Sequence, residues 1–209
     1  MSGHRDLIAS LSKDLESVKP PAGSDRVALT WLVVSGLYVV AVTSVLGPIR
    51  PNALTQPLTE PRFLLETLVG VAAIVSLTLI AFRAAVPGAL SKKFALMGFG
   101  LLVFWLGSYV VGLASPALEP SMLGKRHYCV FETFIYALPP ILAAFILTRR
   151  LYPLRPVQTA LWYSLAAGMI PALYMQLACM YIPAHILQFH IMPGLLVGLL
   201  GACLGLIKR

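Results

Sequence analysis

Charged residues are scarce in this sequence, and their scarcity decides its broad class. Only 11% of the 209 residues are charged, whereas 58% are hydrophobic. A soluble globular domain has about 25% charged residues. Several apolar runs also reach the roughly 20 residues that a helix needs to cross a bilayer. We therefore predict an all-α integral membrane protein, in which residues 1–26 form a polar tail and residues 27–209 form the membrane domain.

Recognisable catalytic motifs are also missing. The sequence has no Walker loop, no HExxH zinc motif and no set of residues suited to a Ser-His-Asp triad. The only acids within the apolar runs are Glu66 and Glu132, each near one end of its run. Ion-driven carriers usually bury ionisable groups near the middle of the membrane. We therefore expect neither an enzyme nor a pump, and no cofactor, nucleic-acid partner or small-molecule substrate.

Six apolar runs predict six membrane-spanning helices, at residues 27–46, 63–82, 94–113, 130–147, 159–180 and 189–207. Lys and Arg are distributed unequally between the segments that join them. Of 16 such residues, 12 lie in the N-terminal tail, the second and fourth connecting segments and the C-terminus. Because Lys and Arg are enriched in cytoplasmic segments, both termini are predicted to be cytoplasmic.

The tail contains an amphipathic segment, DLIASLSKDLESVKPP, whose apolar residues recur at helical spacing. A lone helix of this length is marginal in water. Its apolar stripe therefore needs a surface, which is either the bilayer, the protein's own loops or the groove of a partner protein. The acidic residues of the segment favour a basic partner over anionic lipid. The candidate partner-binding residues are Leu7, Ile8, Leu11, Asp14 and Leu15.

Prolines fall inside two of the predicted spans. Pro139 and Pro140 lie in the fourth and Pro171 lies in the fifth. Proline removes a backbone donor from a helix, so we expect these helices to be interrupted or kinked. Broken helices line the pathways of many transporters. A small membrane transporter or metal-efflux protein is therefore an alternative function.

The sequence has only three cysteines and no CxxC pair. We expect Cys203, near the inner end of the last span, to be a packing residue. Counting spans places Cys129 and Cys179 at the same outer face, as a functional thiol pair, a static disulfide or packing residues. The helix dipole at Cys129, together with Lys125 and Arg126, favours a thiolate there, although Glu132 opposes it. Cys129 is thus predicted to attack or to capture metal, with Cys179 as its resolving partner.

Further residues with metal-ligating groups are predicted at the same face. Two thiolates with an imidazole or a carboxylate suit a soft metal ion. The two glutamates of the apolar runs would also be stabilised by free amides in the first turn of a helix, and histidines at the membrane interface are often simple anchors. The possible sensor neighbours are Glu66, Glu132, His127, His185, His190 and Gln176.

Five motifs occur in order along the chain: DLIASLSKDLESVKPP, EPRFLLE, CVFETFIYALPP, RRLYPLRP and LACMYIPAHILQFHIMPG. Together they resemble the NrsF-type six-span membrane anti-sigma factors of bacteria, and CxxET followed by ALPP is the most specific match. The resemblance implies a bacterial inner-membrane protein that sequesters an extracytoplasmic-function sigma factor. It also implies two outer cysteines that are needed for release under metal or oxidative stress, and these map onto Cys129 and Cys179. It implies no enzyme activity.

The leading hypothesis is therefore a membrane-embedded sensor in which oxidation or metal capture at Cys129 and Cys179 ties two helices together. Glu132 would tune Cys129, cap its helix or bind the metal. Besides the transporter, the remaining alternative is a passive scaffold whose two outer cysteines form a fixed disulfide.

Overall fold

The computed structural model describes residues 2–13 and 23–206, and the regular structure of these residues is helical. A single β-bridge joins Ser121 to Tyr181. The all-α prediction is therefore confirmed for the described residues. The helices are α1 (Ser2–Lys13), α2 (Ser24–Leu46), α3 (Gln56–Thr59), α4 (Pro61–Ala84), α5 (Lys92–Gly112), α6 (Cys129–Arg149), α7 (Pro156–Ala178), α8 (Pro183–Ile186), the π-helix η1 (Leu187–Ile191) and α9 (Met192–Leu204).

Five helical segments are long and apolar enough to cross a membrane. They are α2, α4, α5, α6 and the continuous segment Pro183–Cys203, which comprises α8, η1 and most of α9. They correspond to five of the six predicted spans, with the last beginning at Pro183 instead of residue 189. The fifth predicted span corresponds to α7, which ends at Ala178 and is not among these five candidates.

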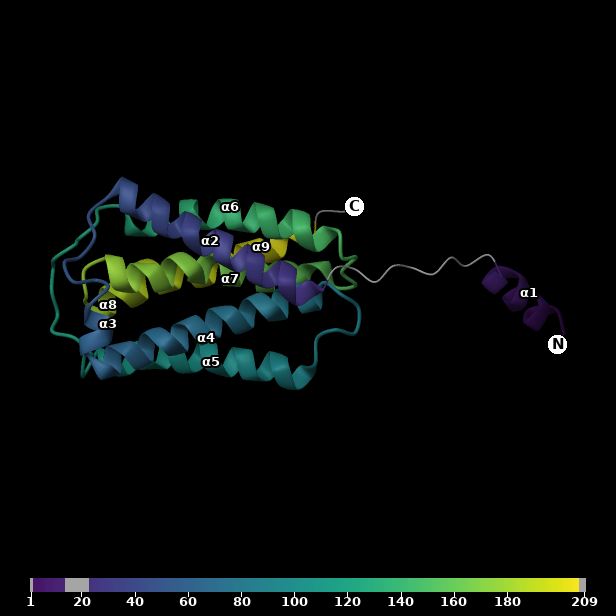
Figure 1. The fold of residues 1–209 in the computed structure, drawn as a ribbon, viewed down its shortest axis with the longest axis horizontal. Coiled ribbons are helices and arrows are strands. Elements are labelled where there is room, and N and C mark those ends of the chain that lie inside the picture. The colour runs from purple at the N-terminus through teal and green to yellow at the C-terminus, as the bar shows by residue number, and fades with distance from the viewer. Residues whose placement is uncertain (1, 14–22, 207–209) are drawn as a thin grey trace.

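Helix α7 lies at the centre of the bundle (Figure 1). It packs against α9, α4, α6 and α2, and most of its side chains are buried. Glycines allow α7 and α9 to approach closely, because a Cβ on Gly168 would lie 2.5 Å from the carbonyl oxygen of Gly194. Small residues of this kind let membrane helices pack backbone against backbone.

The helices α6 and α7 continue through their prolines, so the expected interruptions are absent. Pro139 and Pro140 lie inside α6, and Pro171 lies inside α7. Membrane helices tolerate proline where neighbouring helices supply partners for nearby backbone groups. At the Pro139–Pro140 pair, α6 is also bonded to a neighbouring helix, because Nε1 of Trp31 in α2 donates a hydrogen bond to the Pro140 carbonyl at 3.0 Å.

Helices α3 and α8 lie together at one end of the bundle, which we call the site end (Figure 1). The first residue of α6 and the last residue of α7 lie there too. The tail joins the bundle at the opposite end, through the start of α2. The sequence-based prediction that Cys129 and Cys179 reach the same end is therefore confirmed.

The described part of the tail forms helix α1. The side chains of Leu7, Ile8 and Leu11 are all exposed on it. Residues Ser2–Lys13 are therefore helical, and the amphipathic role of the tail stays a prediction. The other two candidate partner-binding residues, Asp14 and Leu15, lie outside the described residues.

Candidate metal centre

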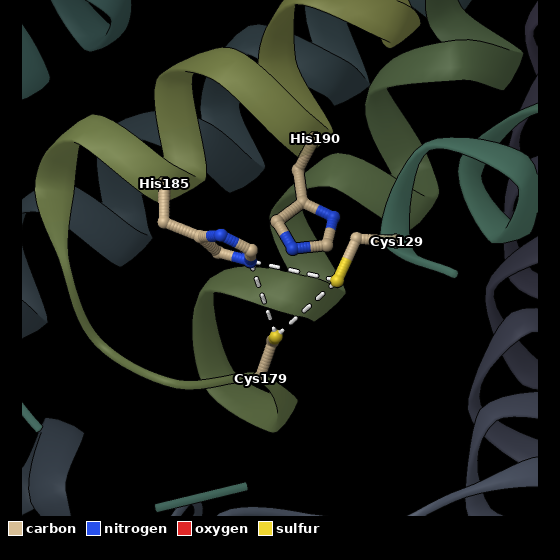
Figure 2. A group of neighbouring side chains, drawn as sticks. All are labelled: Cys129, Cys179, His185 and His190. Carbon is tan, nitrogen blue, oxygen red and sulfur yellow. Dashed lines mark hydrogen bonds between the residues drawn. The ribbon is translucent and has the colours of Figure 1, made fainter. Parts of the chain in front are cut away.

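Two cysteines and two histidines meet at the site end, and each comes from a different element (Figure 2). Cys129 is the first residue of α6, and Cys179 follows the last residue of α7. His185 lies on α8 and His190 on η1. Their sulfur and nitrogen atoms all lie within 4.8 Å of one another. The two cysteines and His190 are buried, and His185 is half-buried.

The distances within this cluster match those expected between the ligands of one tetrahedral ion. The two sulfurs are 3.8 Å apart. The Nε2 of His185 lies 3.5 Å from the sulfur of Cys129 and 3.6 Å from that of Cys179. Zinc bonds of about 2.3 Å to sulfur and about 2.05 Å to nitrogen would separate two sulfurs by about 3.8 Å and sulfur from nitrogen by about 3.6 Å. Three of the four groups therefore have the spacing of ligands around one tetrahedral ion, and the nitrogen of His190 lies within 4.8 Å of them.

His190 supports this interpretation, because it is fully buried and both of its ring nitrogens lack a hydrogen-bond partner among the described residues. Burying a polar group without a partner is costly. The ring of His190 packs edge-on against that of His185, with 5.2 Å between centroids. Figure 2 shows it beside the sulfur of Cys129. A metal ion at the cluster would give one of its nitrogens a partner.

The π-helix η1 brings the two histidines together. They are five residues apart, which would separate them by about 140° around an α-helix. In η1 the N–H of Met192 instead donates to the carbonyl of Leu187, a bond that spans five residues. This wider turn places residues five apart on one face. Pro193, two residues after the end of η1, has no N–H for the usual bond to the carbonyl four residues earlier.

The surroundings of Cys129 differ from the sequence-based expectation. Its sulfur lies 3.4 Å from the carbonyl oxygen of Arg126, to which a thiol can donate a hydrogen bond. The Arg126 guanidinium was expected to favour a thiolate, but it is paired with Glu132 at 2.7 Å. That Cys129 is the more reactive sulfur of the pair stays a prediction.

Arg50 holds the end of α7 that carries Cys179. Its backbone N–H donates to the carbonyl of Ala178 at 2.8 Å, and its guanidinium donates to the carbonyl of Gln176 at 3.4 Å. The guanidinium is buried near the rings of Phe63 and Tyr181. Burial lowers the pKa of Arg50 from its ordinary value, yet arginine stays charged at any physiological pH. The sequence did not predict this role, because Arg50 is one of several Lys and Arg residues in the predicted outer segments and no local pattern sets it apart.

We expect Arg50→Met to weaken metal binding by about 10- to 100-fold, the range found when residues that support metal ligands are changed. The matched control is Arg62→Met, because Arg62 is a more exposed arginine at the same end. Competition titration of the purified protein against a coloured chelator measures the affinity. Equal affinities in the wild type and in Arg50→Met would show that Arg50 does not support the site.

Two of the predicted sensor neighbours near Cys129 lie outside the cluster. His127 is exposed in the loop before α6. Glu132 does lie in the first turn of α6, as predicted, but its carboxylate pairs with Arg126 instead of facing the sulfurs. Cys203 was expected to pack in the bundle and is instead exposed on α9.

The other two, Glu66 and Gln176, are buried deeper in the bundle. Because α4 begins at Pro61, Glu66 lies beyond the first turn, and the capping role expected for it is wrong. Its nearest charged partner is Arg62, at 3.5 Å. The side chain of Gln176 donates to the hydroxyl of Thr67 at 3.0 Å. Neither residue contributes to the four-residue cluster.

No curated protein and no solved structure matches the chain. A family model does match it, and its description is "Negative regulator of sigma F". The match extends from residue 11 to residue 207. It therefore includes all the long helices and each member of the Cys₂His₂ cluster. The chain belongs to the NrsF family of negative regulators of sigma F.

Proposed function

We propose that this protein is a membrane-bound anti-sigma factor of the bacterial inner membrane. It sequesters an extracytoplasmic-function sigma factor and releases it when a metal ion or an oxidant reaches Cys129 and Cys179. Membership of the NrsF family supports the negative regulation of a sigma factor. The observation that favours a metal signal is the set of sulfur and nitrogen distances in the cluster with His185 and His190.

The topology proposed here has six spans, with α7 as the fifth. Helix α7 is 23 residues long, as long as α2, and it lies alongside the five candidate spans. Other helices surround it, so it needs less apolar character than a helix that faces lipid. An even number of spans puts both termini on one side. The excess of Lys and Arg in the tail and in the second and fourth loops makes that side the cytoplasm.

Reporter fusions test this topology. Fusions after Arg26, Leu90 and Arg155 should report the cytoplasm, because these points lie on the side rich in Lys and Arg. Fusions near Asn52 and Ser121 should report the outside. An outside signal after Leu90 would reverse the orientation and place the cysteine–histidine cluster in the cytoplasm.

Metal capture is a better fit to the cluster than a static disulfide. Both cysteines are free, with their sulfurs 3.8 Å apart. A disulfide requires the sulfurs to close to about 2.05 Å, and it would give the buried ring of His190 no partner. Oxidation is the second proposed signal, because an oxidant that accepts two electrons from the thiols, with the loss of two protons, would form a disulfide between Cys129 and Cys179. The transporter alternative loses its main support, since α6 and α7 are not broken.

The tail is the proposed contact with the sigma factor. Helix α1 exposes Leu7, Ile8 and Leu11, and this apolar surface suits the groove of a partner. Leu15 extends the same predicted stripe, and Asp14 is the acidic residue of the predicted contact. In this arrangement the partner binds at the end of the bundle opposite the cluster.

Co-purification tests the proposed function. Tagged protein from unstressed cells should bring down a sigma factor, identified by mass spectrometry. Adding zinc or cadmium to the isolated complex should release it, and a chelator should prevent the release. A complex without any sigma factor would contradict the proposal, and a complex indifferent to metal and to oxidant would contradict the signal.

A further inference from the structure

Helix α2 is the element that leads from the site end to the tail. It begins at Ser24, close to the tail, and ends at Leu46, near the start of α6. Much of its contact with α6 is loose. A groove of about 550 Å³ lies between the two helices, with Val34 and Tyr38 on one side and Ala143 on the other. Two polar contacts nevertheless join α2 to α6 and to the residues just before it, one beyond the groove at the site end and one within the groove.

The first contact is made by Arg126, just before α6. Its Nη1 donates to the carbonyl of Pro48 at 2.9 Å and lies 3.4 Å from that of Thr43. These carbonyls are at the C-terminal end of α2, where backbone acceptors lack helical partners and favour a cation. Gly47 provides the space, because a Cβ there would lie 2.6 Å from the guanidinium. Glu132 holds the guanidinium from the other side, at 2.7 Å.

Arg126 is also in direct contact with the cluster. Its backbone carbonyl accepts the hydrogen bond from the sulfur of Cys129, three residues away. A displacement of Cys129 would therefore displace the backbone of Arg126, and with it the contact to α2.

The second contact lies within the groove, whose lining includes both Trp31 and Pro140. The Nε1 of Trp31 donates to the carbonyl of Pro140 at 3.0 Å, and the indole is buried. The acceptor belongs to the Pro139–Pro140 pair, where α6 lacks two backbone donors. Trp31 also packs against Phe82 of α4, with 5.8 Å between ring centroids. A shift of α6 thus acts on α2 at a point two turns from the start of the helix.

We propose that Arg126 and Trp31 are positioning residues that couple the cysteine–histidine cluster to α2, so that α2 transmits the signal to the tail. This inference rests on the proposed function. Arg126 transfers the movement of Cys129 to the end of α2 nearest the cluster. Trp31 transfers the movement of α6 to the end of α2 nearest the tail.

The first experiment compares Trp31→Phe with Trp162→Phe in a sigma-dependent reporter strain. Phenylalanine keeps an aromatic ring but cannot donate to Pro140. Trp162 is the matched control, because its indole N–H has no hydrogen-bond partner among the described residues. Trp31→Phe should bind metal and repress normally, yet show induction reduced about fivefold, as expected from one buried hydrogen bond. Trp162→Phe should match the wild type.

The second experiment uses the wild-type sequence and therefore does not depend on whether a variant folds. The protein has three tryptophans, so labelling with 5-fluorotryptophan gives three ¹⁹F NMR resonances. Zinc should shift the resonance of Trp31 and leave that of Trp162 in place. In Arg126→Lys, which keeps a positive charge for Glu132 but loses the forked donor, the shift at Trp31 should shrink.

The proposed function and the coupling through α2 are contradicted by different results. If the wild-type protein bound no metal and its reporter did not respond, the proposed function would be wrong. If the wild type responded to metal while the Trp31 resonance stayed fixed, the coupling through α2 would be wrong and the proposed function would stand. Full induction in Trp31→Phe would likewise contradict the coupling through α2 and leave the proposed function standing.

Discussion

Replacing Cys129 or Cys179 by serine is expected to abolish the induction of a sigma-dependent reporter and to leave repression in unstressed cells intact. Serine is nearly the same size, so the bundle should fold, but its hydroxyl neither binds soft metals well nor forms a disulfide. Neither sulfur is near the start of α2, which follows the tail, so the resting complex should persist. The measurement is reporter activity with and without cadmium, zinc or an oxidant, and the loss should be complete in both variants.

Three further variants identify the signal. Cys203→Ser is the matched control and should behave as the wild type, because Cys203 is exposed and away from the cluster. His185→Ala and His190→Ala should lose the response to metal, since each removes one of four ligands. Both should keep a response to oxidant if the thiols form a disulfide. Normal induction in both serine variants would rule out a thiol signal altogether.

Replacing Leu11 by aspartate is expected to make the reporter constitutively active. Leu11 lies exposed on the apolar stripe of α1, and an unpaired charge in a partner's groove costs several kcal/mol. Such a loss lowers the affinity for the sigma factor by at least a hundredfold. Reporter activity without stress and co-purification of the sigma factor both measure the effect.

The control for Leu11→Asp is Ser10→Asp, which adds the same charge to α1 on a different face of the helix. Its hydroxyl only bonds locally, to the carbonyl of Leu7. This variant should repress normally. If Leu11→Asp also repressed normally, the tail would not be the contact, and the inner loops would be the next surface to test.

Features that depend on long stretches of sequence were predicted well. Runs of about 20 apolar residues have few alternatives to a membrane helix, so α2, α4, α5 and α6 begin and end within a few residues of their predicted limits. The common location of Cys129 and Cys179 followed from counting these helices. His185 and His190 were among the predicted sensor neighbours, although the π-helix that aligns them was not foreseen.

Features that depend on contacts between distant elements were not predictable in the same way. The guanidinium of Arg126 pairs with Glu132, whereas sequence proximity alone placed it beside Cys129. The support of α7 by Arg50 joins residues that are more than a hundred positions apart in the chain. The hydrogen bond from Trp31 to Pro140 is of the same kind, and no local pattern indicates that α6 continues through its prolines.

The most direct test of the central claim is X-ray absorption spectroscopy of the purified, reduced protein after addition of one equivalent of zinc. The account predicts a four-coordinate ion with two sulfur neighbours at about 2.3 Å and two nitrogen neighbours at about 2.05 Å. Loss of one sulfur neighbour in Cys179→Ser and of one nitrogen neighbour in His190→Ala would assign the ligands. Zinc that remains surrounded by oxygen alone, or that washes away from the reduced protein, would contradict the metal site.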